Sequence, residues 1–90
     1  YDLNPVPVDI RPRILSTAID MDDPTASFEL ALSTADYYGL RQGKAKDIAR
    51  QVAHAVADWR GEAVRLGISS REIERMASAF EHEDARKALA

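Results

Sequence analysis

The sequence predicts an all-α fold: a three-helix bundle preceded by a proline-rich arm with one short strand. The first observation behind this is that all four prolines lie within the first 24 residues, where they favour extended and turn conformations. The second is that apolar residues recur every three or four positions through most of the remaining chain. We therefore divide the chain into an extended arm at residues 1–24 and a three-helix subdomain at residues 25–90.

The arm contains one segment with the character of a strand. Residues 13–19 read Arg-Ile-Leu-Ser-Thr-Ala-Ile, and their β-branched side chains favour a short extended strand. A single strand leaves its backbone groups unpaired, so we expect another strand or a loop to supply partners. The chain begins at Tyr1 and not at a methionine, and we expect it to be a piece of a larger protein.

The first helix is predicted from about Thr25 to Tyr38. Acidic residues precede Pro24 and Thr25, a combination that marks a helix start, and Gly39 supplies the left-handed residue at which many helices end. Because Tyr37 and Tyr38 are adjacent, they cannot both point inward, and Tyr37 is a candidate interface residue. The apolar stripe of this helix consists of Phe28, Ala31, Leu32, Ala35 and Tyr38.

The second helix is predicted from about Lys44 to Leu66, and Gly67 ends it. Trp59, the only tryptophan, lies on its apolar stripe and is expected in the core. That stripe consists of Ala45, Ile48, Val52, Ala55, Trp59, Ala63 and Leu66, and the polar face carries Asp47, Gln51, His54 and Asp58.

The third helix has the clearest start signal. Ser69 and Glu72 form a capping box, in which hydroxyl and carboxylate each bind an otherwise unpaired amide. Ile68 and Ile73 occupy the two hydrophobic staple positions on either side of it. The buried stripe continues as far as Phe80, and residues 85–90 either carry on as helix or fray.

Two places in the helices carry side chains that could hold a metal ion. His54 and Asp58 are one helical turn apart, a spacing that allows a shared ion, but we favour the interpretation that they belong to a solvated helix face. His82 lies among Glu81, Glu83 and Asp84. A cation could bind there, and an acidic helix end exposed to water explains the pattern equally well.

The third helix also suggests a helix-turn-helix recognition element. Its candidate face carries Arg71, Glu72, Glu74 and Arg75, so opposite charges are present in equal numbers. Attraction to phosphate would be weak on such a face, and structural packing is the better interpretation.

Three separated segments resemble, in order and spacing, the C-terminal part of HipA-like serine/threonine kinases of bacterial toxin–antitoxin systems. They are Tyr-Asp-Leu-Asn-Pro-Val-Pro at residues 1–7, Leu-Ser-Thr-Ala-Ile-Asp at 15–20 and Arg-Met-Ala-Ser-Ala-Phe-Glu-His at 75–82. The resemblance spans nearly the whole chain and implies that it is equivalent to the helical end of a kinase-like C-lobe.

The resemblance implies one site residue. The opening Tyr-Asp-Leu is similar to the family's metal-binding motif, so Asp2 carries over as a ligand of the Mg²⁺ that neutralises the phosphates of ATP. The family's catalytic aspartate, its second metal-binding asparagine and its nucleotide-binding lysine would all lie before Tyr1. We therefore expect no catalytic or nucleotide-binding residue in these 90 residues, and no tight binding of Mg²⁺ or ATP by them alone.

The resemblance also implies partners. The parent kinase would transfer the γ-phosphoryl group of ATP to a serine or threonine of a protein substrate, and a HipB-like antitoxin would neutralise it. DNA would be contacted only indirectly, through the antitoxin.

A second hypothesis is a stand-alone three-helix protein-interaction module. Under both hypotheses the composition indicates one soluble domain, because 46% of the residues are hydrophobic and 30% are charged.

Composition also excludes several classes of function. No cysteine is present, which rules out a disulfide framework and a thiolate zinc site, and we take the cytoplasm as the default location. The net charge of −3 disfavours direct binding of DNA or RNA. No apolar stretch approaches the roughly 20 residues of a membrane span, so no membrane partner is expected.

Overall fold

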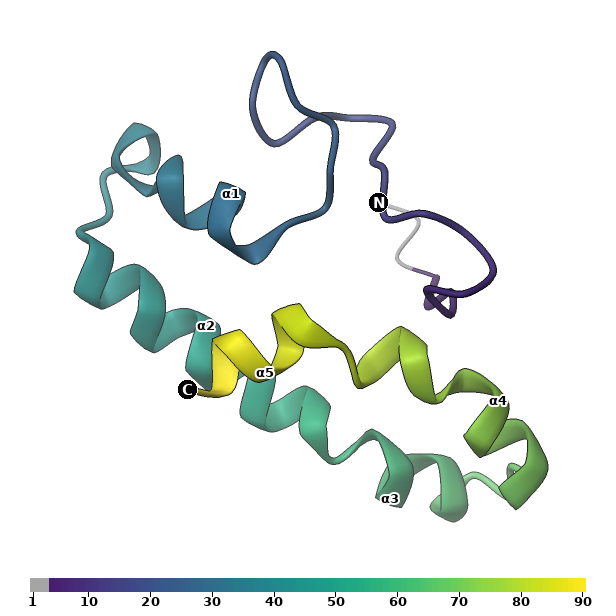
Figure 1. Cartoon of the computed structure of the whole chain (residues 1–90). Coiled ribbons are helices and arrows are strands. Elements are labelled where there is room, and N and C mark those ends of the chain that lie inside the picture. Colours follow the sequence, from purple (N-terminus) through teal and green to yellow (C-terminus); the bar gives the residue numbers. More distant parts are fainter. Residues whose placement is uncertain (1–3) are drawn as a thin grey trace.

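The protein is mostly helical in the computed structural model, which describes residues 4–90 (Figure 1). No strand or sheet is present within that range. The elements are α1 (Phe28–Ser33), the 3₁₀ helix η1 (Ala35–Tyr38), α2 (Gln42–Ala57), α3 (Trp59–Arg65), α4 (Ser70–Phe80) and α5 (Glu83–Leu89). The all-α prediction is therefore confirmed at this level.

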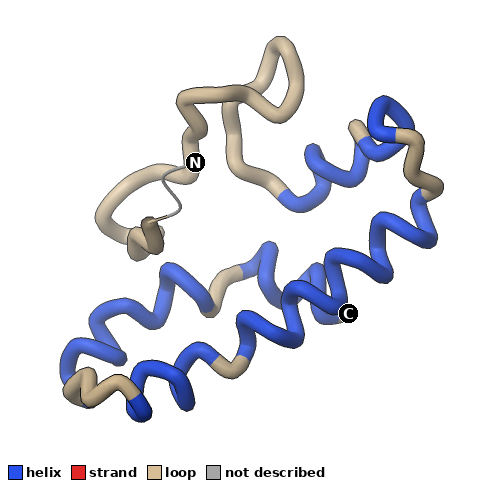
Figure 2. The backbone as a smooth tube through the Cα atoms, turned by 180° about the vertical axis from the view of Figure 1, so that it is seen from behind, coloured by secondary structure: helices blue, strands red, loops and turns tan. Residues whose placement is uncertain are grey.

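The helices form two long antiparallel runs, with a third, shorter run beside one end. α2 and α3 continue nearly in line, and α4 and α5 return alongside them (Figures 1 and 2). α3 packs against α4, and α5 packs against both α2 and α1. Polar contacts also hold α5 to α2 and α1: Arg50 of α2 donates to the carbonyl of Ala90, directly after α5, at 2.9 Å, and Lys87 of α5 donates to Glu29 of α1 at 2.9 Å.

The predicted strand at residues 13–19 is wrong. The segment makes only an isolated antiparallel bridge, Ile14 with Thr25. Its partner is the chain's own turn: the Leu15 amide donates to the Pro24 carbonyl at 2.6 Å, and the Ala26 amide donates to the Arg13 carbonyl at 2.7 Å. Because Pro24 has no N–H to donate, this pairing cannot extend into a regular ladder.

The first helical stretch begins later than predicted and is interrupted. The Asp23 carboxylate accepts the Thr25 amide at 2.9 Å in a local turn, and the helix starts only after Ser27. Hydrogen bonds from the side chain and then the amide of Thr25 lower the pKa of Asp23. The Ser27 hydroxyl caps the helix by accepting the Leu30 amide. At Thr34 the α-helix gives way to η1, which leaves Tyr38 73% exposed and not on a buried stripe.

The second stretch begins at Gln42, two residues before the predicted start, and is interrupted at Asp58. Asp58 belongs to the residues with weak helix propensity, and its carboxylate lies over Gly61. A Cβ atom at Gly61 would approach Asp58 Oδ1 to 2.9 Å, so glycine leaves the room that this carboxylate occupies. Gly67, at φ 82°, ends the stretch as predicted.

The third stretch confirms the predicted start and settles the open question of its end. Ser69 is the N-cap of α4, and its hydroxyl accepts the Glu72 amide at 3.3 Å. The helix breaks after Phe80 and resumes as α5. His82 caps this second helix, because its Nδ1 atom accepts the Ala85 amide at 3.2 Å.

The buried core is small. Ala35, Ala63 and Ile73 are the buried hydrophobic residues described, and Thr34, next to Ala35 in the chain, is buried as well. Large apolar side chains on α2 and α3 remain exposed, including Val52 at 58% and Val64 at 66%. The amphipathic faces predicted from the sequence are therefore present but only partly covered.

Replacing Ser69 by alanine should destabilise the fold by about 1 kcal/mol, because the Glu72 amide loses its acceptor at the helix end. Urea unfolding followed by circular dichroism measures the change. Ser70→Ala is the matched control, since Ser70 is already inside the exposed first turn. Equal losses for both variants would contradict the assignment of Ser69 as the cap.

Candidate functional site

An apolar groove of about 880 Å³ lies between the arm and α1 on one side and α2 and α5 on the other. Its large apolar lining residues come from six parts of the chain: Ile19, Phe28, Val52, Val56, Trp59, Phe80 and Leu89. Charged residues lie along one end of it, among them Arg13, Glu81 and Asp84. We refer to this feature as the apolar groove.

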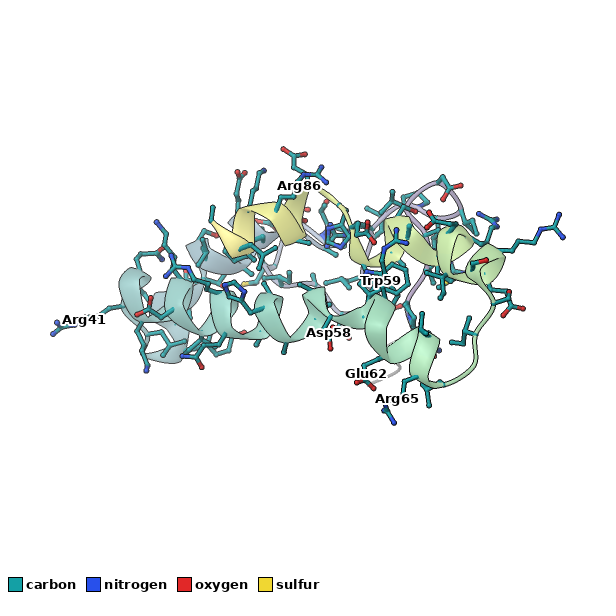
Figure 3. All side chains as sticks on the ribbon, turned by 90° about the horizontal axis from the view of Figure 1, so that it is seen from below. Arg41, Asp58, Trp59, Glu62, Arg65 and Arg86 are labelled. Atoms are coloured by element: carbon teal, nitrogen blue, oxygen red, sulfur yellow. The ribbon has the colours of Figure 1, made fainter. Side chains whose placement is uncertain are left out.

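The α4–α5 turn, defined here as residues 81–84, holds α3 through Glu81. The indole Nε1 of Trp59 donates to the Glu81 carboxylate at 3.0 Å, and Arg60 Nε donates to it at 2.7 Å. Arg60 also pairs with Glu74 of α4, at 2.5 Å. Figure 3 shows Trp59 pointing toward α4, whereas Asp58 points away on the opposite side of the helix run.

An aromatic stack lies beside these ionic contacts. The rings of Trp59 and Phe80 are 4.6 Å apart between centroids and nearly parallel, and the Arg60 guanidinium lies 5.0 Å from the indole centroid. The hydrogen bonds to Glu81 and Glu74 raise the pKa of Arg60, and the bond from Arg60 lowers the pKa of Glu81. Both groups are therefore charged throughout the neutral range.

The same turn holds the arm through His82 and Asp84. Arg13 Nη1 donates to Asp84 Oδ2 at 2.6 Å and lies 3.4 Å from His82 Nδ1. Asp84 is only 17% exposed in this pair. Burial lowers the pKa of His82, and the positive charge of Arg13 lowers it further, while Asp84 acts in the opposite direction.

A second tether joins the arm to α4. The Val8 amide donates to the Ser78 hydroxyl at 3.1 Å, and that hydroxyl donates to Asp9 at 3.2 Å. Arg75 lies 3.5 Å from the same carboxylate. Residues 8–13 are thus held against the third helical stretch at two places, Ser78 and the α4–α5 turn.

The candidate metal ligands suggested by the sequence do not lie together in the described part of the chain. Asp2, the predicted magnesium ligand, lies outside the described residues. His54 and Asp58 are both exposed, on α2 and at the break after it. His82 faces Arg13 and the Ala85 amide, not a cluster of carboxylates. Across residues 4–90, no three histidine, aspartate or glutamate side chains are placed to share a metal ion.

The remaining predicted residues have mixed outcomes. Trp59, expected in the core, is half-buried in its stack on Phe80. Tyr37 is 85% exposed and therefore accessible, as an interface residue would have to be. On the suggested recognition helix, Arg75 and Glu74 are engaged with Asp9 and Arg60, which favours the structural interpretation of that face.

Sequence reasoning missed Arg13 and the roles of the α4–α5 turn. Arg13 and Asp84 are 71 positions apart, and no local pattern links them. The cap at His82 did leave a signal, because two acidic residues follow it, as they often do in the first turn of a helix.

The comparisons with known proteins add no relative: no family model, curated protein or solved structure matches the chain. Within the described part, none of the helices is long and apolar enough to cross a membrane.

Phe80→Ala should destabilise the fold by about 2 kcal/mol, because it removes both the stack on Trp59 and apolar area at the groove. Urea unfolding followed by the fluorescence of Trp59 measures this. Val64→Ala is the control: Val64 is 66% exposed, so a change below about 0.5 kcal/mol is expected. A Phe80→Ala loss no larger than that of the control would show that the stack contributes nothing.

Proposed function

We propose that this chain is the C-terminal helical segment of a HipA-like serine/threonine kinase, the toxin of a bacterial toxin–antitoxin pair. In this proposal α1 with η1, α2 with α3, and α4 with α5 are the three interrupted helices of a bundle at the end of a kinase-like C-lobe. Residues 1–24 are the arm that connects the bundle to the remainder of the lobe.

The proposal is supported by the way in which the resembling segments lie together. Ile19 of the second segment and Phe80 of the third line the same groove. Val8 and Asp9, directly after the first segment, are bonded to Ser78 of the third. The segments that agree with one family in order and spacing therefore also lie together in the fold, as the proposal requires.

Within this proposal Asp2 is the magnesium ligand. A carboxylate there would offset the negative charge of the ATP phosphates as the γ-phosphoryl group moves to a serine or threonine of the substrate protein. The base and the ATP cradle would come from upstream residues. A HipB-like antitoxin would bind the kinase in the cytoplasm and supply the only contact with DNA.

A stand-alone protein-interaction module is the alternative, and the apolar groove favours it. The groove is open, and the two valines of α2 that line it, Val52 and Val56, are exposed. Surfaces of this kind are common at contacts between proteins. In the kinase proposal, the same groove is covered by another part of the lobe.

The 90-residue chain alone should bind Mg-ATP no more tightly than millimolar, because it lacks the expected base, lysine and phosphate-binding loop. Isothermal titration calorimetry of the chain with Mg-ATP measures this. Micromolar binding would contradict the proposal that the ATP-binding groups of the kinase lie upstream of this segment.

In the parent protein, Asp2→Asn should lower the rate of phosphoryl transfer by on the order of a hundredfold or more, because a metal ligand is lost. Autophosphorylation with labelled ATP measures the rate. Asp22→Asn is the matched control, since Asp22 is an exposed aspartate of the same arm. Activity that survives Asp2→Asn would reject the metal role, and an upstream reading frame without an aspartate and asparagine in a catalytic loop would favour the interaction module.

A further inference from the structure

His82 occupies a position that the proposed kinase chemistry does not use. Its Nδ1 atom is approached by two donors, the Ala85 amide at 3.2 Å and Arg13 Nη1 at 3.4 Å. Neither group can act as an acceptor, because a backbone N–H and a guanidinium only donate. Nδ1 must therefore carry a lone pair, and the imidazole is neutral with its proton on Nε2.

Protonation of this imidazole changes both contacts at once. A hydrogen on Nδ1 would point at the Ala85 amide hydrogen and at Arg13, so the cap of α5 and the contact with the arm are lost together. The charged groups facing His82 are Arg13 from the arm and Asp84 and Arg86 from α5. Two of these three are cations, so the imidazolium gains less from Asp84 than it loses to Arg13 and Arg86.

The arm and α5 meet at His82 beside the apolar groove. Arg13, His82 and Asp84 all line it, as do Ala85 and Leu89 farther along α5. Separation of Arg13 from His82 would leave the Arg13–Asp84 ion pair as the remaining described polar contact between the arm and this end of α5. That pair is partly exposed, and such pairs are individually weak.

We propose that His82 is a pH-sensitive clasp that holds the start of α5 and the arm together when neutral and opens this end of the apolar groove when protonated. This inference concerns regulation of the groove and does not depend on the kinase assignment. The arm is the part that moves, because α5 keeps its separate contacts with α2 and α1 through Arg50 and Lys87.

The direction of the pH effect follows from linkage. The closed state disfavours the imidazolium, so the pKa of His82 lies below its ordinary value of 6.5. The open state therefore takes up the proton more readily. The clasp is at full strength above pH 6.5 and weakens as the pH falls from there through the lowered pKa.

The experiment is a pH series from about 7.5 to 5.5, a range in which unperturbed carboxylates stay ionised, on the isotopically labelled 90-residue chain. Nitrogen NMR of the imidazole should show the Nε2–H form at the upper end. Amide exchange, corrected for its intrinsic pH dependence, should show the protection of Ala85 falling about fivefold, the loss expected when a helix cap is removed.

Two variants distinguish the titration of His82 from a general loss of stability at lower pH. His82→Asn supplies a side-chain oxygen as a cap that does not titrate, so Ala85 should keep its protection throughout the range. His54→Asn removes the other histidine, which is exposed on α2, and should behave like the unchanged chain.

Should His82→Asn fail to fold, His82→Asp provides a second non-titrating cap over the same range. The proposal is overturned if the imidazole is protonated on Nδ1 at pH 7.5. It is also overturned if the exchange protection of the Ala85 amide does not change with pH in the unchanged chain. A third contradicting result is a folded His82→Asn or His82→Asp variant in which this protection falls with pH as steeply as in the unchanged chain.

Discussion

The α4–α5 turn is the point on which the rest of the structure depends. Within residues 81–84, Glu81 accepts from Trp59 and Arg60 of α3, while His82 and Asp84 hold Arg13 of the arm. Three parts of the chain that are distant in sequence are thus joined at one turn. A single exposed ion pair contributes less than about 1 kcal/mol, so it is the combination with the Trp59–Phe80 stack that gives this junction its strength.

The junction matters because the hydrophobic core is small. Burial of apolar surface normally supplies most of the free energy of folding, yet the buried hydrophobic residues described here are two alanines and Ile73. The apolar faces of α2 and α5 line an open groove and do not lie in a closed interior. A further surface seated in that groove would bury Val52 and Val56, whether it belongs to the same protein or to a partner.

Local signals predicted where helices start and end better than whether they are continuous. Ser69, Gly39 and Gly67 act through their own side chains or backbone angles, so their roles can be read from the sequence alone. The breaks at Thr34 and Asp58 lie within stretches of regular apolar spacing, which predicts a continuous helix. The break at Glu81 instead follows the end of the apolar stripe at Phe80. The strand prediction failed because β-branched composition at residues 13–19 says nothing about a partner, and the available partner contains Pro24.

The contacts made by the resembling segments determine how far the resemblance supports a function. The segment at residues 75–82 contains Ser78, Phe80, Glu81 and His82, each of which has a structural contact in this fold. Ile19 of the segment at residues 15–20 lines the groove. These contacts give both segments a structural role in this fold. Only residues 1–7 contain a residue, Asp2, whose proposed role is chemical, so the kinase proposal depends on that residue and on the catalytic groups expected upstream of it.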